Sequence, residues 1–500
     1  MSRHHSVSRA AERDLPGSSV ATTDVQKLAA FIHAADFRDI SAAAVAQLKI
    51  RVLDTLGVAI AALDAPPMVA IRGLTRSLGG SRDATLIGGG LAPIDRVAFH
   101  NIALSRYLDF MDSYLAPGET CHPSDNIGAV LAAVESVGAK GRDFLTAVAV
   151  AYQIQTRLSD VAPVRARGFD HTVQGAYAVA GAVAKALNLT PAQIANAIAI
   201  SGTANNALRV TRTGDLSNWK GLAYPEVGKE GVFAALLARA GITGPMQVFE
   251  GNKGFKETIA GDFSIDWSRE DLESVLRTVV KKHNAEVHSQ SSIDAAITIG
   301  TQTGFRADAI RAVRVKTFQV AYDIIGGGEE GDKRHVRTKE EADHSLPYMV
   351  AVALLDGQVQ PQQYAPERIV RPDVQALLRK VSVTPYSAFT ERFPAEMPSQ
   401  VEVELYDGTR FCVSASSFEG FTLQPLDWDA AVQKFSRLAT PFTGELLAER
   451  IARVVRRLEE HEVLELTMLL EQIPVARADT AGLHGRLQAA KESNHVQHQF

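Results

Sequence analysis

Polar side chains are most densely clustered at residues 105–126 of this 500-residue chain. Asp109 and Asp112 are three positions apart, a spacing that predicts two carboxyl groups on one face of a helix. A like-charged pair that close raises the pKa of one carboxyl group, which suits general acid–base catalysis. His122 precedes Pro123, and this favours an extended or turn conformation at the histidine. The competing interpretation is that Asp112 and its polar neighbours only cap helices.

Two further segments carry candidate ligands for an anion. Residues 168–172 predict the head of a helix, where the positive end of the helix dipole and His171 could hold a carboxylate. Lys220 stands between Trp219 and Gly221 in a predicted loop, and it could offer a point charge to a substrate carboxylate. The plainer interpretations are a surface or capping histidine and a solvated lysine.

A third polar segment, residues 284–291, has six side chains that can form hydrogen bonds, among them Glu286, His288 and Gln290. The segment 342–348 then opens an apolar helix. Asp343 or Ser345 is the expected N-cap of that helix, a role that is compatible with a functional one.

The first half of the chain, from about residue 25 to residue 244, predicts a helical domain. Alanine-rich segments with helical periodicity are separated there by Gly and Pro, without convincing β-alternation. One helix start is well marked, because Thr190 can act as N-cap, Pro191 takes the first helical position and Gln193 can complete a capping box. Further helices are expected at residues 41–63, 142–160, 173–187 and 229–240.

Strand patterns enter after about residue 263. Residues 313–316 alternate between valine and charged side chains, and residues 401–413 predict a β-hairpin with a two-residue turn at Asp407-Gly408. Helices are expected at residues 291–301 and 342–355. The predicted fold is therefore mostly α with a smaller α+β domain.

The expected domain division has five parts. They are a disordered extension (1–24), an all-helical domain (25–268), an α+β lid domain (269–420), helices that return to the helical domain (421–475) and a loose tail (476–500). The tail helices are expected to pack on the first domain, so that both ends of the chain would build it.

Composition excludes several classes of function. A formal net charge of −5 and the lack of a Lys/Arg run argue against nucleic acid and anionic membranes as partners. The two cysteines cannot form a disulfide framework, and a four-iron cluster needs more thiolates than this chain has. No apolar run approaches the ~20 residues of a membrane-spanning helix, and residues 1–24 lack the apolar core of a secretory signal. A cytoplasmic location is therefore expected.

Five segments resemble successive blocks of the MmgE/PrpD family: LDFMDSYL…HPSDNIGAVLAAVE, NWKGLAYPEVGKEGVFAALLA, FEGNKGF, AEVHSQSSIDAA and ADHSLPYMVAVALLDG. The HPSDN and ADHSLPY forms resemble the members that dehydrate 2-methylcitrate more than those that decarboxylate cis-aconitate. The resemblance implies a hydro-lyase of the methylcitrate cycle of propionate catabolism, with a tricarboxylate substrate and neither metal nor other cofactor. It also implies a homodimer whose active site lies in a cleft between the helical domain and the lid.

The resemblance further implies roles for individual residues. The matched active-site positions are Asp109, Ser113, His122, His171 and Lys220. Asp109 and His122 are expected to form the base and acid pair in either order, while Lys220, His171, Ser113 and Asp112 hold or orient substrate carboxylates.

The lid positions are less specific. The decarboxylase branch carries a histidine near Glu286 that this chain lacks, so Glu286, His288 and Gln290 are all candidates. Tyr322 is the candidate for the family's lid tyrosine, and it precedes an insertion-like GGGEEG stretch at residues 326–331.

Three alternative functions stay open. The same pocket could serve cis-aconitate decarboxylation, or dehydration or isomerisation of citrate or another tricarboxylate. The Asp-x-x-Asp pair resembles half of a Mg²⁺-diphosphate site of helical terpenoid synthases, although no second metal motif accompanies it. A helical binding protein without catalytic activity is the non-enzymatic alternative.

Overall fold

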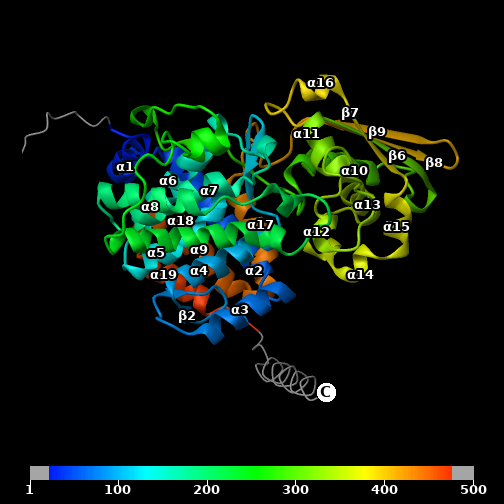
Figure 1. Cartoon of the computed structure of the whole chain (residues 1–500). Helices are drawn as coiled ribbons and strands as arrows, with labels where there is room; N and C mark the ends of the chain where they lie inside the picture. The colour runs from blue at the N-terminus through cyan, green and yellow to red at the C-terminus, as the bar shows by residue number, and fades with distance from the viewer. Residues whose placement is uncertain (1–21, 476–500) are drawn as a thin grey trace, which may run out of the picture.

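The computed structural model describes residues 22–475, which fold around two hydrophobic cores (Figure 1). One core draws its residues from 25–280 and 426–473, and we call this part the helical half. The other draws on residues 279–421 and includes a four-stranded sheet, and we call it the smaller half. The expected disordered extension and loose tail lie outside the described residues, apart from residues 22–24, where the first helix begins.

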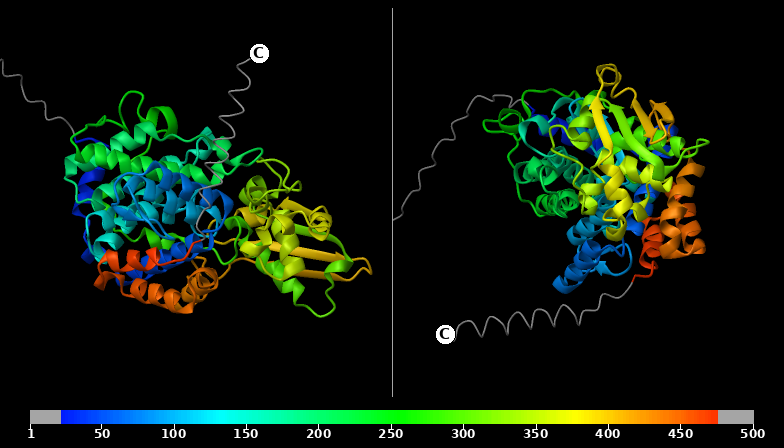
Figure 2. Two further views of the ribbon diagram at one scale, coloured as in Figure 1. Left: turned by 90° about the horizontal axis from the view of Figure 1, so that it is seen from below. Right: turned by 90° about the vertical axis from the view of Figure 1, so that its right-hand side faces the viewer.

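The helical half takes its helices from both ends of the chain. They are α1 (Asp24–Ala34), α2 (Ala42–Ala61), α3 (Pro66–Leu78), α4 (Ile94–Tyr107), α5 (Ile127–Ser136), α6 (Gly141–Val161), α7 (Thr172–Ala186), α8 (Pro191–Ala204), α9 (Trp219–Arg239), α17 (Trp428–Thr443), α18 (Glu445–Arg456) and α19 (Val463–Glu471). Helix α17 packs on α2, and Figure 2 shows the C-terminal helices in orange and red against this half. The end of the chain therefore completes the core that its beginning starts.

Helix starts follow the sequence where capping residues mark them. The capping box expected at Thr190 and Gln193 is present at the start of α8. Helix α9 differs from the prediction, because it begins at Trp219 rather than near Lys229 and so includes Lys220, which was expected in a loop. Pro225 lies inside α9, where it cannot donate a main-chain hydrogen bond. The packing of α9 against α4, α7 and α8 compensates for the stability lost with that bond.

Short strands interrupt the helical half, contrary to the all-helical prediction. They are β1 (Ala84–Thr85), β2 (Leu91–Ala92), β3 (Asp112–Ala116), β4 (Glu119–Cys121) and β5 (Val279–Val280), with β3 between β4 and β5. Helix α4 ends at Tyr107, and Asp109 has a φ of 54°, in the left-handed region. The prediction that Asp109 and Asp112 share a helix face is therefore wrong, because the chain leaves the helix before either residue. The alternative of a helical Mg²⁺-diphosphate motif required the same helix face, so it is wrong for the same reason.

The smaller half contains a four-stranded sheet, with the strand order β7-β6-β8-β9, and helices that pack on it. Its elements are α10 (Gln290–Gly300), β6 (Ile310–Thr317), α11 (Gln319–Ala321), α12 (Lys339–Ala342), α13 (Leu346–Asp356), α14 (Pro366–Ile369), α15 (Pro372–Leu378), β7 (Val381–Pro385), α16 (Ser387–Thr390), β8 (Ser399–Leu405) and β9 (Arg410–Ala415). Strands β8 and β9 form the expected hairpin, but residues 406–409 separate them, because Gly408 adopts a φ of 87° and lengthens the turn.

One break in the smaller half matters for the site. The helix expected at residues 342–355 is two helices, α12 and α13, and the break between them holds Asp343 and His344. Ser345 is the N-cap of α13, as expected, because its hydroxyl accepts a hydrogen bond from the amide of Tyr348.

These elements confirm the predicted fold class, mostly α with a smaller α+β part. Among the described residues, no single helix is long and apolar enough to cross a membrane. Helices α2 and α3 meet the length and hydropathy requirements only as a pair, and that pair is bent by 93°.

The return of the C-terminal segment to the helical half predicts a sensitive glycine. Gly141 begins α6, and a Cβ atom there would lie 1.8 Å from the carbonyl oxygen of Leu458. Gly141→Ala should therefore lower the free energy of unfolding by about 1–3 kcal/mol, the usual cost of overpacking. Gly73→Ala on α3 is the matched control, since no atom lies within 4 Å of its Cβ position, and it should be neutral or stabilising by about 0.5–1 kcal/mol. Equal unfolding midpoints in urea for the two variants would contradict this packing.

Candidate active site

Asp109 occupies the turn between α4 and β3, and it is 3% exposed. Lys281 follows β5, which pairs with β3, and this pairing brings the lysine to the aspartate. The Nζ atom of Lys281 donates to both the carbonyl oxygen and Oδ1 of Asp109, at 2.7 Å each. The short sheet that the sequence analysis did not expect is thus what fixes the Asp109 carboxylate.

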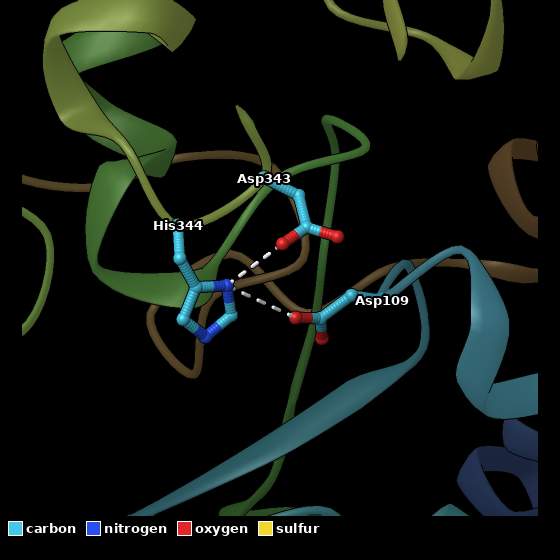
Figure 3. A group of neighbouring side chains, drawn as sticks. All are labelled: Asp109, Asp343 and His344. Carbon is cyan, nitrogen blue, oxygen red and sulfur yellow. Dashed lines mark hydrogen bonds and ion pairs between the residues drawn. The ribbon is translucent and has the colours of Figure 1, made fainter. Parts of the chain in front are cut away.

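The break between α12 and α13 supplies a second carboxylate to the same place (Figure 3). Lys220 Nζ donates to Asp343 Oδ1 at 2.5 Å and lies 3.5 Å from Asp109 Oδ2. His344 Nδ1 points at both carboxylates, 2.9 Å from Asp343 and 3.7 Å from Asp109. Lys339 Nζ contacts the other oxygen of Asp343 at 2.6 Å. Lys220 of the helical half is therefore paired with a residue of the smaller half.

Three lysines keep the two carboxylates of this cluster ionised. Burial alone would raise the pKa of Asp109, but the ammonium groups of Lys281 and Lys220 outweigh burial and hold that pKa well below its usual range. The same competition, with Lys220 and Lys339 as the cations, lowers the pKa of Asp343. Burial lowers the pKa of Lys220, although both carboxylates oppose the shift.

The cluster also resembles a set of metal ligands, because donor atoms of Asp109, Asp343 and His344 lie within 4.8 Å of one another. Lysine ammonium groups already contact both carboxylates, however, and Lys281 and Lys220 supply the positive charge that a cation would bring. The donor set therefore does not fit a resident metal, and we assign none.

His122 lies at the end of β4, in the non-helical conformation that the following proline predicts. Its Nδ1 atom is 2.8 Å from the carbonyl oxygen of Asp112 and 3.1 Å from Ser113 Oγ. A carbonyl can only accept, so Nδ1 carries the proton and Nε2 of the neutral ring is an acceptor. Burial lowers the pKa of His122 well below its usual range, and the charges of Arg106 and Lys281 lower it further.

His171 precedes α7, and its ring lies 5.3 Å from that of His122, centroid to centroid. Its Nδ1 atom is 3.2 Å from Asp170 Oδ1, while its Nε2 atom is buried without a hydrogen-bond partner among the described residues. Asp170 is itself held by Arg212 Nε at 2.5 Å. Burial lowers the pKa of both histidines well below its usual range, so two neutral imidazoles lie side by side. Neither Nε2 atom has a hydrogen-bond partner within residues 22–475.

Two charged residues beside the histidines were not predicted as site residues. Arg106 on α4 is 2% exposed, and its Nε atom has no hydrogen-bond partner among the described residues. Its nearest anion is Asp125, with NH1 to Oδ2 at 3.5 Å. Burial raises the pKa of Asp125 to about 7, although Arg106 opposes that shift. Arg106 is therefore a buried cation next to the cluster with few partners for its guanidinium group among the described residues.

Three predicted residues are already engaged in other contacts. The carboxylate of Asp112 accepts hydrogen bonds from the Tyr152 hydroxyl at 2.7 Å and the Ser124 amide at 3.2 Å. Gln290 bonds only to main-chain groups of residues 282–285. Tyr322 lies in the turn 322–326 of the smaller half, where it faces the glycines of its own loop. These contacts support the fold around the site.

Glu286 and His288 form a pair at the border of the cluster. Glu286 Oε1 is 2.7 Å from His288 Nδ1, and the ring of His288 packs against Phe318 and Phe393, which stack on each other. The amide of Glu286 donates to the carbonyl oxygen of Asp343 at 3.3 Å. The pair thus supports the loop that carries Asp343, while the imidazole itself belongs to the apolar core of the smaller half.

The cluster opens into a cleft between the two halves. Arg106, Asp109 and Lys220 line it together with Lys339 and Tyr107. Its volume is about 360 Å³ including the mouth, but only about 10 Å³ is wide enough for a water molecule. A molecule much larger than water can therefore enter only if the cleft widens.

Two family models match most of the chain. The model of the MmgE/PrpD N-terminal domain matches residues 26–268, and that of the MmgE/PrpD C-terminal domain matches residues 283–460. The chain belongs to the MmgE/PrpD family. Among its relatives, the 2-methylcitrate dehydratase of Escherichia coli (strain K12) is 29% identical over 72% of this chain and 78% of the relative.

More distant branches of the MmgE/PrpD family also match. The mitochondrial 2-methylcitrate dehydratase of Yarrowia lipolytica is 27% identical over 77% of each chain. The cis-aconitate decarboxylase of Mus musculus is 25% identical over 89% of this chain and 93% of the relative. The family assignment therefore rests on both parts of the chain, while two reaction types occur among the named relatives.

Lys281, Arg106 and His344 were not predicted as site residues, and Asp343 was predicted as an N-cap whose role is compatible with a functional one. A signal existed for Lys281, because two lysines directly follow an apolar pair in the run VVKKHNAEVHS, and a lysine there is expected to be partnered if it is buried. No local signal distinguishes Arg106 from any other arginine near the end of a helix.

The buried carboxyl group of Asp125 gives a pH-dependent stability prediction. Its pKa is raised from 3.8 to about 7 in the folded protein, so the folded state holds a proton that the unfolded chain releases between those values. Stability is therefore lost as the pH rises through this window. Asp125→Asn should remove the loss, and its free energy of unfolding relative to the wild type should rise between pH 5 and pH 8 by up to about 3 kcal/mol. The exposed Asp64→Asn is the control, and an equal pH response of the two variants would contradict the prediction.

Proposed function

We propose that this chain is a hydro-lyase that converts 2-methylcitrate to 2-methyl-cis-aconitate, as a step of propionate catabolism. The observation that carries the proposal is a group of buried cations near a neutral histidine, His122. Lys220 and Arg106 line the cleft, and Lys281 is paired with Asp109, which also lines it. The match to named 2-methylcitrate dehydratases over about three quarters of the chain supports the same reaction. A soluble homodimer in the cytoplasm, without a metal or other cofactor, is part of this proposal.

Elimination of water begins with removal of a proton from the carbon next to a carboxylate. His122 is the base in this proposal, because its Nδ1 proton is committed to the Asp112 carbonyl and Nε2 is left to accept. Its lowered pKa keeps the ring neutral at physiological pH, so the base is in its active form. Ser113, 3.1 Å from the same Nδ1 atom, orients the ring.

The tertiary hydroxyl then needs a proton in order to leave as water. Asp109 is a poor donor, because its lysine neighbours keep it ionised. Its expected membership of the acid–base pair is therefore revised in the proposal: Asp109 keeps Lys220 and Lys281 charged and placed, and Lys220 delivers the proton. Burial lowers the pKa of Lys220, which makes its ammonium group a better acid than a solvated lysine.

The negative charge that develops on the substrate carboxylate needs preorganised cations and donors. Arg106 has an unpartnered Nε atom at the cleft, and its planar guanidinium group suits a carboxylate. Lys281 can exchange one of its two contacts with Asp109 for a substrate oxygen. A tricarboxylate matches this group of cations better than a neutral substrate would.

Decarboxylation of cis-aconitate is the second candidate function. It is favoured by the similarity of this chain to the mouse cis-aconitate decarboxylase over 93% of that relative. The same cations would bind its substrate, and the two reactions differ in whether water or CO₂ leaves.

A substrate test separates these candidates. The protein, treated with EDTA, is incubated with 2-methylcitrate, citrate and cis-aconitate while the absorbance of the conjugated double bond and released CO₂ are followed. We expect absorbance to rise with 2-methylcitrate, without CO₂ and without dependence on added divalent metal. A fall in cis-aconitate absorbance with CO₂ release would move the function to decarboxylation, and dependence on metal would contradict the lysine-based mechanism.

Variants test the assigned roles. His122→Ala and Asp109→Asn should each lower kcat by about 10²–10⁴-fold, because one removes the base and the other the partner that keeps two lysines in place. Lys220→Ala should lower kcat and raise KM, since the proposed acid also faces the substrate. His335→Ala, whose side chain is 85% exposed, is the matched control and should retain wild-type kinetics. Wild-type turnover in both His122→Ala and Asp109→Asn would refute the assignment.

A further inference from the structure

The glycine-rich stretch 326–331 has no role in the chemistry above, yet it carries a buried carboxylate. Gly327 and Gly331 adopt φ values of 105° and 89°, so this turn depends on glycine. Glu330 lies between them with a side chain 3% exposed, whereas its neighbour Glu329 has a side chain 76% exposed. Of these two adjacent glutamates, only Glu330 is therefore buried.

Glu330 is buried against the helical half. Its Oε1 atom accepts a hydrogen bond from Arg209 NH2 at 2.5 Å and lies 3.4 Å from Arg165 NH2. The amide of Glu330 donates to the carbonyl oxygen of Asp323 at 2.9 Å, which ties the residue to the smaller half. This carboxylate thus joins the two halves at the segment next to the histidines.

Arg209 also borders Asp170, the residue that holds His171. The segments that carry them are bonded together, Arg209 amide to Gly168 carbonyl and Asp170 amide to Ala207 carbonyl, at 2.9 Å each. Arg209 NH1 is 3.7 Å from Asp170 Oδ2, farther than the 2.5 Å that joins its NH2 to Glu330. Arg209 therefore lies between two carboxylates, closer to that of the smaller half.

We propose that Glu330 is a positioning residue for His171: it holds Arg209 off Asp170, so that Asp170 can orient the imidazole when the smaller half is docked. Asp170 Oδ2 accepts the short hydrogen bond from Arg212 Nε, while Oδ1 faces His171 Nδ1 at 3.2 Å and accepts longer bonds from Arg212 NH2 and the Thr172 amide. Without Glu330, Asp170 is the anion that Arg209 already approaches, and a second guanidinium group there would compete with the imidazole. The orientation of a histidine in the helical half would in this way depend on whether the smaller half is docked.

Other charges acting on His171 are Asp170, Arg212 and Arg106, together with His122 in the adjacent segment. Glu330→Gln leaves these in place and removes the partner of Arg209 and Arg165, of which Arg209 is the one that also pairs with Asp170. The proposal thus predicts a change in the titration of His171 as well as in turnover. A residue that only anchors the loop would not change that titration through Arg209.

The experiment compares Glu330→Gln, Glu329→Gln and the double variant Glu330→Gln/Arg209→Gln in the full-length protein. Glu330→Gln should lower kcat/KM by about 10- to 100-fold, as loss of an orienting partner does elsewhere. Glu329→Gln should retain wild-type values. The double variant should recover most of the loss, because the unpaired guanidinium group is then absent. A double variant as weak as Glu330→Gln or weaker would overturn the proposal.

The kinetic measurements rest on the proposed function, so a second readout is independent of it. Nuclear magnetic resonance titration of the His171 ring should show a lower pKa in Glu330→Gln than in the wild type and a return towards the wild-type value in the double variant. If the wild type dehydrates no substrate, the proposed function fails while this titration still tests the positioning role. An unchanged titration in Glu330→Gln would overturn it. If Glu330→Gln does not fold, Glu330→Asp, which keeps the charge on a shorter side chain, should give a smaller shift in the same direction.

Discussion

The structure depends on a buried chain of alternating charges that crosses the boundary between its two halves. The chain runs through Lys339, Asp343, Lys220, Asp109 and Lys281, with neighbours joined at 2.5–3.5 Å. Burying any one of these charges alone would cost several kcal/mol, so each is tolerated only because its neighbours are present. The positions of the α4–β3 turn, the start of α9 and the α12–α13 break are therefore mutually dependent.

Helix α17, in the C-terminal segment that returns to the helical half, contacts the same chain of charges. Lys434 on α17 pairs with Asp54 on α2 at 2.7 Å and donates to the carbonyl oxygens of Phe110 and Lys281. Those two carbonyls flank the Asp109–Lys281 contact. A helix from the end of the chain thus fixes the main chain on both sides of the central pair, which gives a physical reason for a helical half built from both ends of the sequence.

The fold class could be predicted from the sequence because its signals are local, as the capping box at Thr190 and the alternation at residues 401–413 show. The histidines and Lys220 could be identified from the resemblance of their motifs. The turn at Asp109 could not, because its left-handed conformation depends on a lysine 172 positions away. Lys281 and Arg106 were missed for the same reason, since burial of a cation is decided by distant partners and not by neighbours in sequence.

The charge chain also bears on how a polyanion could enter so closed a cleft. In the structure the three lysines are paired with Asp109 and Asp343, which take the places that the carboxylates of the proposed substrate would need. A tricarboxylate can displace these contacts only if it offers equivalent ones, because an unpaired buried lysine is costly. In binding, the substrate carboxylates would then replace those of Asp109 and Asp343 around fixed lysines. A neutral analogue of the same size could not replace these contacts and would gain no binding energy from the lysines. Under the proposed function, selection for the number and spacing of substrate carboxylates would follow from the same buried charges that hold the two halves together.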